Sequence, residues 1–192
     1  MSRKLLVLIF SHLLMVCPPV VNAGDAFEEV FGPVQTATQD DLEIKAPFIG
    51  SFRGSTRQFD DGETEYHFVL NYDWWDAEKN FVKFTVSMVI PSQDRTLLRS
   101  EGFYGFDRFS ERLYVFGVFS GGMTGEGFIG QFDEQAGTHE IWARSVDQEG
   151  VVTWVRDRFE IIDADHWRNQ TLMRRGDEPE FQEVHQDTYT RL

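Results

Sequence analysis

Arginine and tryptophan residues alternate near the end of the chain in a pattern that could bind an acidic molecule. Trp142 and Arg144 are two residues apart, and Trp154, Arg156 and Arg158 repeat this spacing. Side chains two residues apart in a β-strand share one face. An interior with aromatic walls and an arginine suits an amphipathic acid, because a guanidinium group binds a carboxylate through paired hydrogen bonds. The same pattern also fits an outward ladder of charges with the tryptophans in the core, and the sequence leaves both interpretations open.

Glu126 is the acidic residue whose neighbours leave the most room for a ligand, since it lies between Gly125 and Gly127. The alternative is an ordinary surface acid. Acid–base catalysis by two carboxylates needs one of them with a raised pKa, and no such pair can be singled out among the 32 acidic residues. The chain also has no nucleophile elbow, phosphate loop or dinucleotide motif. We therefore assign no catalytic residues and favour a binding protein over an enzyme, such as an isomerase or hydrolase, that uses the same cavity.

These candidate residues lie within a series of short runs rich in Phe, Tyr, Val and Trp. From Pro47 onward the runs are separated by polar turns, which is typical of a β-meander. The predicted strands are at 48–55, 65–73, 81–90, 96–106, 113–120, 124–132, 138–145, 151–162 and 167–174. Short turns that carry Asp or Gly join antiparallel neighbours, because parallel strands need a crossover of about a dozen residues.

Two of these runs show which side each residue faces. Their apolar faces consist of Tyr66, Phe68, Leu70 and Tyr72, and of Phe84, Val86, Met88 and Ile90. A sheet with one apolar face must bury it, and no long amphipathic helix remains to cover it. Closing the sheet on itself buries the apolar face and removes the exposed edges. We therefore predict an all-β fold, an up-and-down antiparallel β-barrel of about eight to ten strands, with a two-sheet β-sandwich as the alternative.

The first run resembles the opening strand of calycin-type barrels. Residues 46–54 read APFIGSFRG, in which a Gly-x-aromatic step places Phe52 as the ring that plugs one end of the barrel. A later Gly105-Phe106-Asp107 turn leads to the run LYVF at 113–116. Together these features make most of residues 42–175 similar to lipocalin-like bacterial exported barrels of unknown function, although Phe52 replaces the usual Trp and lacks its N–H donor. The resemblance implies a calyx for a small apolar ligand and carries over no catalytic residues.

Four histidines follow the first 23 residues, namely His67, His139, His166 and His185. They lie in separate runs with no pair at ligand spacing, so no metal site is expected. His166 is the candidate for a haem ligand, because the small haem-binding barrels called nitrobindins resemble this size and architecture and place their ligand near the chain's end. The preceding Asp163-Ala164-Asp165 instead indicates an exposed hairpin turn. We therefore disfavour haem and expect no cofactor.

The N-terminus has the features of an export signal, with Arg3 and Lys4, an apolar run at 5–16 and a small-residue site at 21–23. The apolar run is shorter than the roughly twenty residues that span a membrane. Cys17 leaves a lipoprotein signal as the alternative. We predict a signal peptide at 1–23, a lead-in with a short helix or irregular segment at 24–46, a barrel domain at 47–175 and a fraying acidic tail at 176–192. The expected location is secreted or periplasmic.

The composition excludes several partners. The formal charge is −14 and becomes −16 without Arg3 and Lys4, whereas nucleic acids and anionic lipids need a clustered basic surface. Removal of residues 1–23 also removes the single cysteine, which excludes disulfides and thiolate metal sites. We expect no nucleic acid, no membrane span and a small apolar or amphipathic molecule as partner.

The predicted function is therefore carriage or scavenging of such a molecule inside the calyx, with an enzyme or a solid-barrel interaction module as the alternatives. Small barrels can be filled by their own side chains, so the presence of accessible interior space decides between a calyx and a solid module. The candidate ligand-binding residues are Phe52, Tyr66, Phe68, Tyr72, Phe84, Met88, Glu126, Trp142, Arg144, Trp154 and Arg158.

Overall fold

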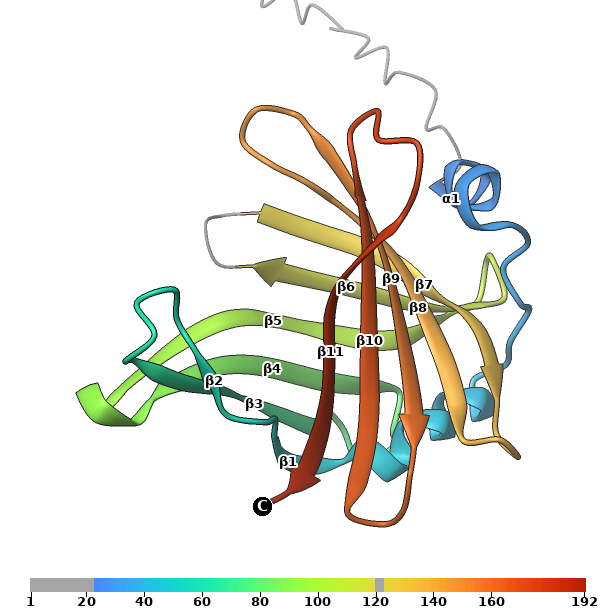
Figure 1. Cartoon of the computed structure of the whole chain (residues 1–192). Coiled ribbons are helices and arrows are strands. Elements are labelled where there is room, and N and C mark those ends of the chain that lie inside the picture. The colour runs from blue at the N-terminus through green and yellow to red at the C-terminus, as the bar shows by residue number, and fades with distance from the viewer. Residues whose placement is uncertain (1–22, 120–122) are drawn as a thin grey trace, which may run out of the picture.

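The computed structural model describes residues 23–119 and 123–192, which form a closed antiparallel β-barrel (Figure 1). Ten strands make its wall. They are β1 (Gly50–Arg53), β3 (Glu65–Trp74), β4 (Phe81–Ile90), β5 (Arg95–Asp107), β6 (Arg112–Phe119), β7 (Met123–Asp133), β8 (Thr138–Val146), β9 (Val152–Ile161), β10 (His166–Arg175) and β11 (Gln182–Arg191). Each strand from β3 onward pairs with the next, and β1 closes the ring by pairing with both β11 and β3. The closure confirms the up-and-down barrel and rules out the sandwich.

Two of the predicted boundaries are wrong. The first strand does not begin at residue 48, because Pro47 and Phe48 end a 3₁₀ helix, η1 (Asp40–Phe48). The acidic tail at 176–192 does not fray, because residues 182–191 form β11, which pairs with β10 along its length and with β1 at its end. The predicted signal peptide lies almost wholly outside the described residues, which start at Ala23.

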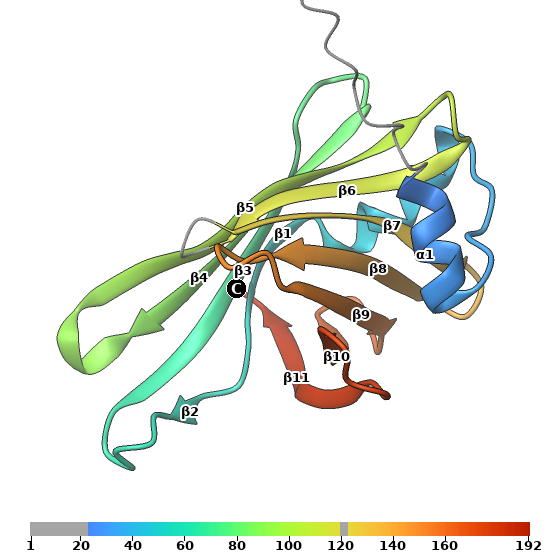
Figure 2. The ribbon, with the colours of Figure 1, turned by 90° about the horizontal axis from the view of Figure 1, so that it is seen from above.

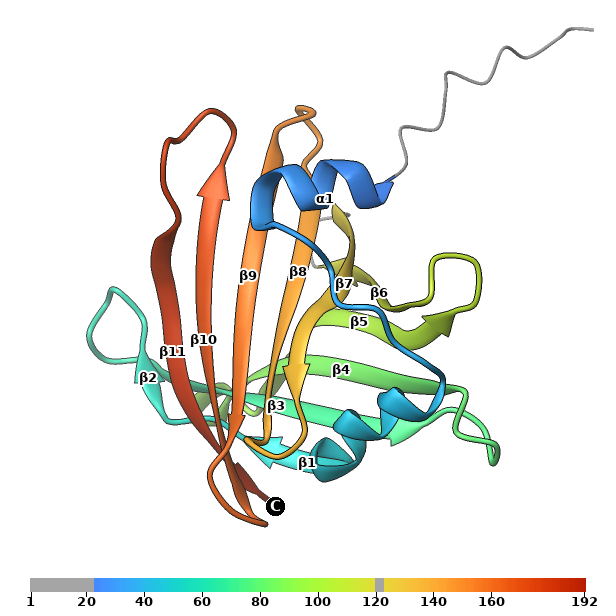
Figure 3. The ribbon, with the colours of Figure 1, turned by 90° about the vertical axis from the view of Figure 1, so that its right-hand side faces the viewer.

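One end of the barrel is plugged by η1, which lies across the opening beside β1 (Figure 3). Its side chains at Leu42, Ile44, Lys45 and Phe48 are all buried. The apolar ones join the main core, where the Phe48 ring packs edge-on against Trp167 at 5.3 Å. Apolar side chains on η1 therefore fix it in the barrel opening by burying area that would otherwise face water.

A second apolar cluster lies outside the barrel, under helix α1 (Ala23–Phe31). This helix crosses the outer surface of β7, β8 and β9 (Figure 3). Phe27 is fully buried and packs edge-on against Phe128 and Trp154, while Phe31 stacks on Trp142 at 5.3 Å. The outer face of these strands is therefore apolar because a helix covers it.

The barrel has a seam between β3 and β11. The four-residue strand β1 joins these strands only near the plugged end, and beyond it β3 pairs with the two-residue strand β2 (Arg57–Gln58). No ladder joins β2 to β11, and Figure 2 shows the two strands diverging from β1. Arg57 bridges the seam by donating to the backbone carbonyl of Gln186 at 2.9 Å.

Glycines on β5 and β6 let an interior ring approach the backbone of the barrel wall. A Cβ at Gly102 would lie 2.6 Å from Cζ of Phe84, far inside van der Waals contact. Gly117, directly opposite Gly102 on β6, lies under the same ring. The Phe84 side chain therefore occupies space that a larger residue at either position would fill.

Candidate ligand-binding lumen

The interior of the barrel has one apolar wall and one polar wall. On the apolar wall, alternate residues of β3 and β4 point inward, and glycines continue the wall on β5, β6 and β7. On the polar wall, formed by β9, β10 and β11, the inward residues include Asp157, Asn169, Thr171, His185 and Asp187. A molecule between these walls meets hydrocarbon on one side and hydrogen-bonding groups on the other.

The inward side chains are most uniformly buried near the plug. Phe52, Tyr72, Tyr104 and His139, near η1, are buried. Farther along the barrel, several inward-facing residues are only partly buried, namely Phe68, Val86, Ala143, Val155 and His185, although Met88 and Ile90 on β4 are buried. The lumen is therefore sealed at the plugged end and reached by solvent at the other.

The floor of the lumen holds a fully buried lysine on η1. Lys45 Nζ lies 2.7 Å from Nε2 of His139, and 4.0 and 4.9 Å from the ring centroids of Tyr104 and Phe159. Burial lowers the pKa of Lys45 well below its ordinary value, and the charge of Asp157 opposes this shift only in part. Burial and the neighbouring lysine likewise lower the pKa of His139. Burial therefore favours the neutral form of both groups, which reduces the cost of removing them from water.

Asp157 projects into the same region from β9. Its carboxylate accepts hydrogen bonds from the hydroxyl of Thr171 and, at 3.4 Å, from the amide of Asn169. Burial raises the pKa of Asp157, while these hydrogen bonds act in the opposite direction. The Asp157 carboxylate is thus held by side chains of the neighbouring strand β10 on the polar wall.

A second set of inward polar side chains, Asp187 and His185 on β11, lies beside the seam between β3 and β11. Asp187 is buried, and its Oδ1 accepts hydrogen bonds from the backbone N–H groups of Ser55 and Thr188, while Arg57 lies 3.5 Å from Oδ2. His185 Nε2 is 3.4 Å from the hydroxyl of Tyr189. Burial, with a smaller effect of Arg57, lowers the pKa of His185, so its imidazole is neutral near pH 7.

Six of the predicted ligand-binding residues face the interior. They are Phe52, Tyr66, Phe68, Tyr72, Phe84 and Met88. Phe52 is buried at the plugged end, and the guanidinium of Arg191 lies 4.5 Å from its ring centroid. Phe68 lies near the seam, where its ring meets that of His185 edge-on at 6.2 Å.

The other five predicted residues face outward, which is the alternative that the sequence left open for them. Arg144 donates to Glu126 at 2.8 Å on the outer surface, and Trp142 and Trp154 lie under α1. Alternation on β8 and β9 points His139, Ile141 and Phe159 inward instead. Alternation alone could not show this, because the helix makes the outer face of these strands apolar too.

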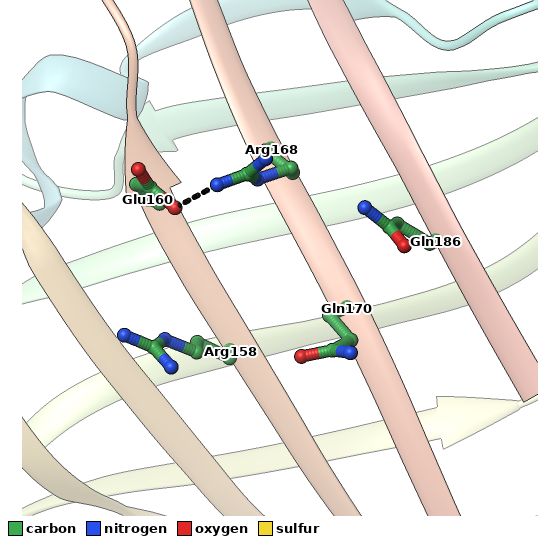
Figure 4. A pocket seen from close by; sticks show the side chains of 5 residues that line it. All are labelled: Arg158, Glu160, Arg168, Gln170 and Gln186. Carbon is green, nitrogen blue, oxygen red and sulfur yellow. Dashed lines mark hydrogen bonds and ion pairs between the residues drawn. The ribbon is translucent and has the colours of Figure 1, made fainter. Parts of the chain in front are cut away.

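Arg158, the fifth of these residues, lines a shallow outer pocket of about 300 Å³. The other lining residues are Glu160, Arg168, Gln170 and Gln186, all on the outer face of β9, β10 and β11, with Arg168 paired to Glu160 (Figure 4). A second outer pocket, of about 540 Å³, is mostly aromatic and includes Trp75, Phe81, Phe103, Tyr114 and Phe116. The first of these pockets, which is polar, is open to solvent, and the ion pair between Arg168 and Glu160 already occupies part of its charge.

The sequence did not single out Lys45, Asp157 or Asp187. Lys45 lies among apolar residues of η1, which is the only local sign of its burial. His166 is the first residue of β10, and its Nδ1 lies 2.8 Å from Oδ1 of Asp163 in the preceding turn. Within residues 23–119 and 123–192 no three His, Cys, Asp or Glu side chains are grouped as metal ligands. The helices of this part of the chain are all too short or too polar to cross a membrane.

Comparison with known proteins supports the fold. No protein-family model matches the chain, and no curated protein matches it. Among solved structures, Rv2717c from M. tuberculosis is similar, with a TM-score of 0.53 and 16% identity over 79% of this chain and 96% of that one. The structure of EF1p2_mFAP2b bound to DFHBI has a TM-score of 0.37 and 9% identity, over 79% and 98%. The chain therefore shares its barrel fold with Rv2717c.

Proposed function

We propose that this protein is a lipocalin-like calyx that binds a small amphipathic molecule in the open half of its lumen. The observation that carries the proposal is the partial exposure of inward-facing side chains on both walls, including Phe68, Val86 and Val155. A barrel filled by its own side chains would bury these positions. Apolar ligand surface placed there gains about 25 cal/mol per Å² before ordering costs.

The net charge and the N-terminal segment support a choice of partner and of cellular location for this function. A net charge of −14 disfavours nucleic acid as a partner, and the signal-like segment at 1–23 favours a secreted or periplasmic location. We infer that the barrel acts without a cofactor, as a carrier or scavenger. N-terminal sequencing of protein from its own host tests the location, and an intact Met1 would contradict it.

Binding can be tested with Nile red, an uncharged dye whose emission moves to the blue in apolar surroundings. We expect saturable binding to the wild-type protein. Val155→Trp, which places an indole in the lumen, should weaken binding at least tenfold. Val118→Trp is the matched control, because Val118 is 49% exposed on the outer face.

The outer aromatic pocket needs its own control. Phe116→Ser removes a ring that is 43% exposed in that pocket and leaves the lumen unchanged. Loss of dye binding in Phe116→Ser, with full binding in Val155→Trp, would assign the dye to the outer pocket and refute the calyx. Absence of saturable binding in the wild type would favour the solid-barrel module. Circular dichroism confirms that each variant folds, and Ala143→Phe serves as a second lumen variant.

A further inference from the structure

Two cationic side chains lie near the polar wall of the lumen, and both are already compensated or out of reach. Lys45 has no exposed surface and is enclosed by His139 and aromatic rings. Arg57 contacts Asp187 and the carbonyl of Gln186 across the seam. Neither cation is therefore available to neutralise an acidic ligand.

The polar wall instead carries acids. Asp157 and Asp187 both face inward, on β9 and β11, with Asn169 and Thr171 between them on β10. The two arginines first considered for an acidic head group, Arg144 and Arg158, lie on the outer face. A carboxylate placed against this wall would thus lose its water shell beside two acids without pairing to Lys45 or Arg57, which is unfavourable.

His185 is the accessible hydrogen-bonding group on this wall. It is partly buried, faces the lumen beside the seam, and lies between the Phe68 ring and the Tyr189 hydroxyl. A neutral imidazole offers one donor and one acceptor. These suit an alcohol, a carbonyl or an amide, whose apolar body can then lie against Phe68 and Val86.

We propose that the lumen selects an uncharged amphipathic molecule and that His185 hydrogen-bonds its neutral polar group. The geometry of the two walls sets the selectivity, since the apolar wall takes the hydrocarbon and the polar wall penalises a carboxylate. This inference rests on the proposed calyx and names the class of ligand that it takes.

The test is competition against Nile red at pH 7.5 by three ligands with the same chain: decan-1-ol, decanoate and decylammonium. We expect decan-1-ol to displace the dye at concentrations at least tenfold lower than decanoate. Equal or tighter binding of decanoate or decylammonium would overturn the selectivity while leaving the calyx intact. Dye that binds the lumen but resists displacement by all three would also overturn it. Failure of the dye to bind would instead refute the calyx, and this inference with it.

The role of His185 is tested by substitution. His185→Phe keeps a ring against Phe68 but removes the hydrogen bond, and should weaken decan-1-ol about fivefold, the effect of one neutral hydrogen bond. His185→Gln retains a donor and an acceptor and should preserve the affinity. His67→Phe is the matched control, because His67 faces outward on β3. Unchanged decan-1-ol affinity in His185→Phe would remove His185 from the site.

Discussion

Replacing Lys45 by Met should make the protein more stable near neutral pH and remove a pH dependence that the lysine creates. Burial lowers the pKa of Lys45 well below that of the unfolded chain, so the unfolded state binds one more proton at pH values between the two. The free energy of unfolding of the wild type then rises by about 1.4 kcal/mol per pH unit in that window. The rise ends near the unfolded pKa of about 10.4.

The magnitude has an upper limit, which is reached when the lysine gives up its proton completely on folding. Deprotonating an unfolded lysine at pH 7.5 costs about 4 kcal/mol, and Met avoids this cost with a side chain of similar length. Met also leaves Nε2 of His139 without its partner at 2.7 Å, which costs about 1–3 kcal/mol. Lys45→Met should therefore be more stable by about 1–3 kcal/mol at pH 7.5, and this advantage should vanish by about pH 9.5.

Urea unfolding followed by tryptophan fluorescence at pH 7.5, 8.5 and 9.5 measures the difference. Lys83→Met is the control, because Lys83 forms a partly exposed ion pair with Glu101 on the outer face. Its effect should be within about 1 kcal/mol and nearly independent of pH. A Lys45→Met difference that stays constant from pH 7.5 to 9.5 would refute the reasoning and show that Lys45 keeps its proton in the folded protein.

Three further substitutions or truncations test the packing. Phe27→Ala empties a fully buried site under α1 and should cost about 3–5 kcal/mol in urea unfolding; a loss below 1 kcal/mol would mean that α1 is not docked. Gly102→Ala forces a Cβ against the backbone carbonyl oxygen of Phe116 and the Phe84 ring, and should lower the thermal midpoint, at a cost of at least about 1–3 kcal/mol. Truncation after Gly176 removes β11 and opens the ring, so the product should lack cooperative unfolding by circular dichroism; a folded product would show that β11 is dispensable.

The local pattern predicted most of the strands, because apolar and polar residues alternate along a strand that has one buried and one exposed face. The run at 81–90 has the bounds of β4, and its inward face was identified from Phe84, Val86 and Met88. β11 was missed because it lacks this clear alternation of apolar and polar residues. Its inward residues include His185 and Asp187, whose polar character hides the alternation and left the segment looking like a tail.

The sequence by itself determined most of the strands, the antiparallel order set by short turns, and the identity of the apolar wall on β3 and β4. Only the tertiary structure decided which face of β8 and β9 is inside, because α1 covers their outer side and makes both faces apolar. Only it brought Lys45 to His139, 94 residues away, and closed the ring through β1 and β11. Alternation is a local property of a few residues, whereas closure and burial depend on packing between segments far apart in the chain.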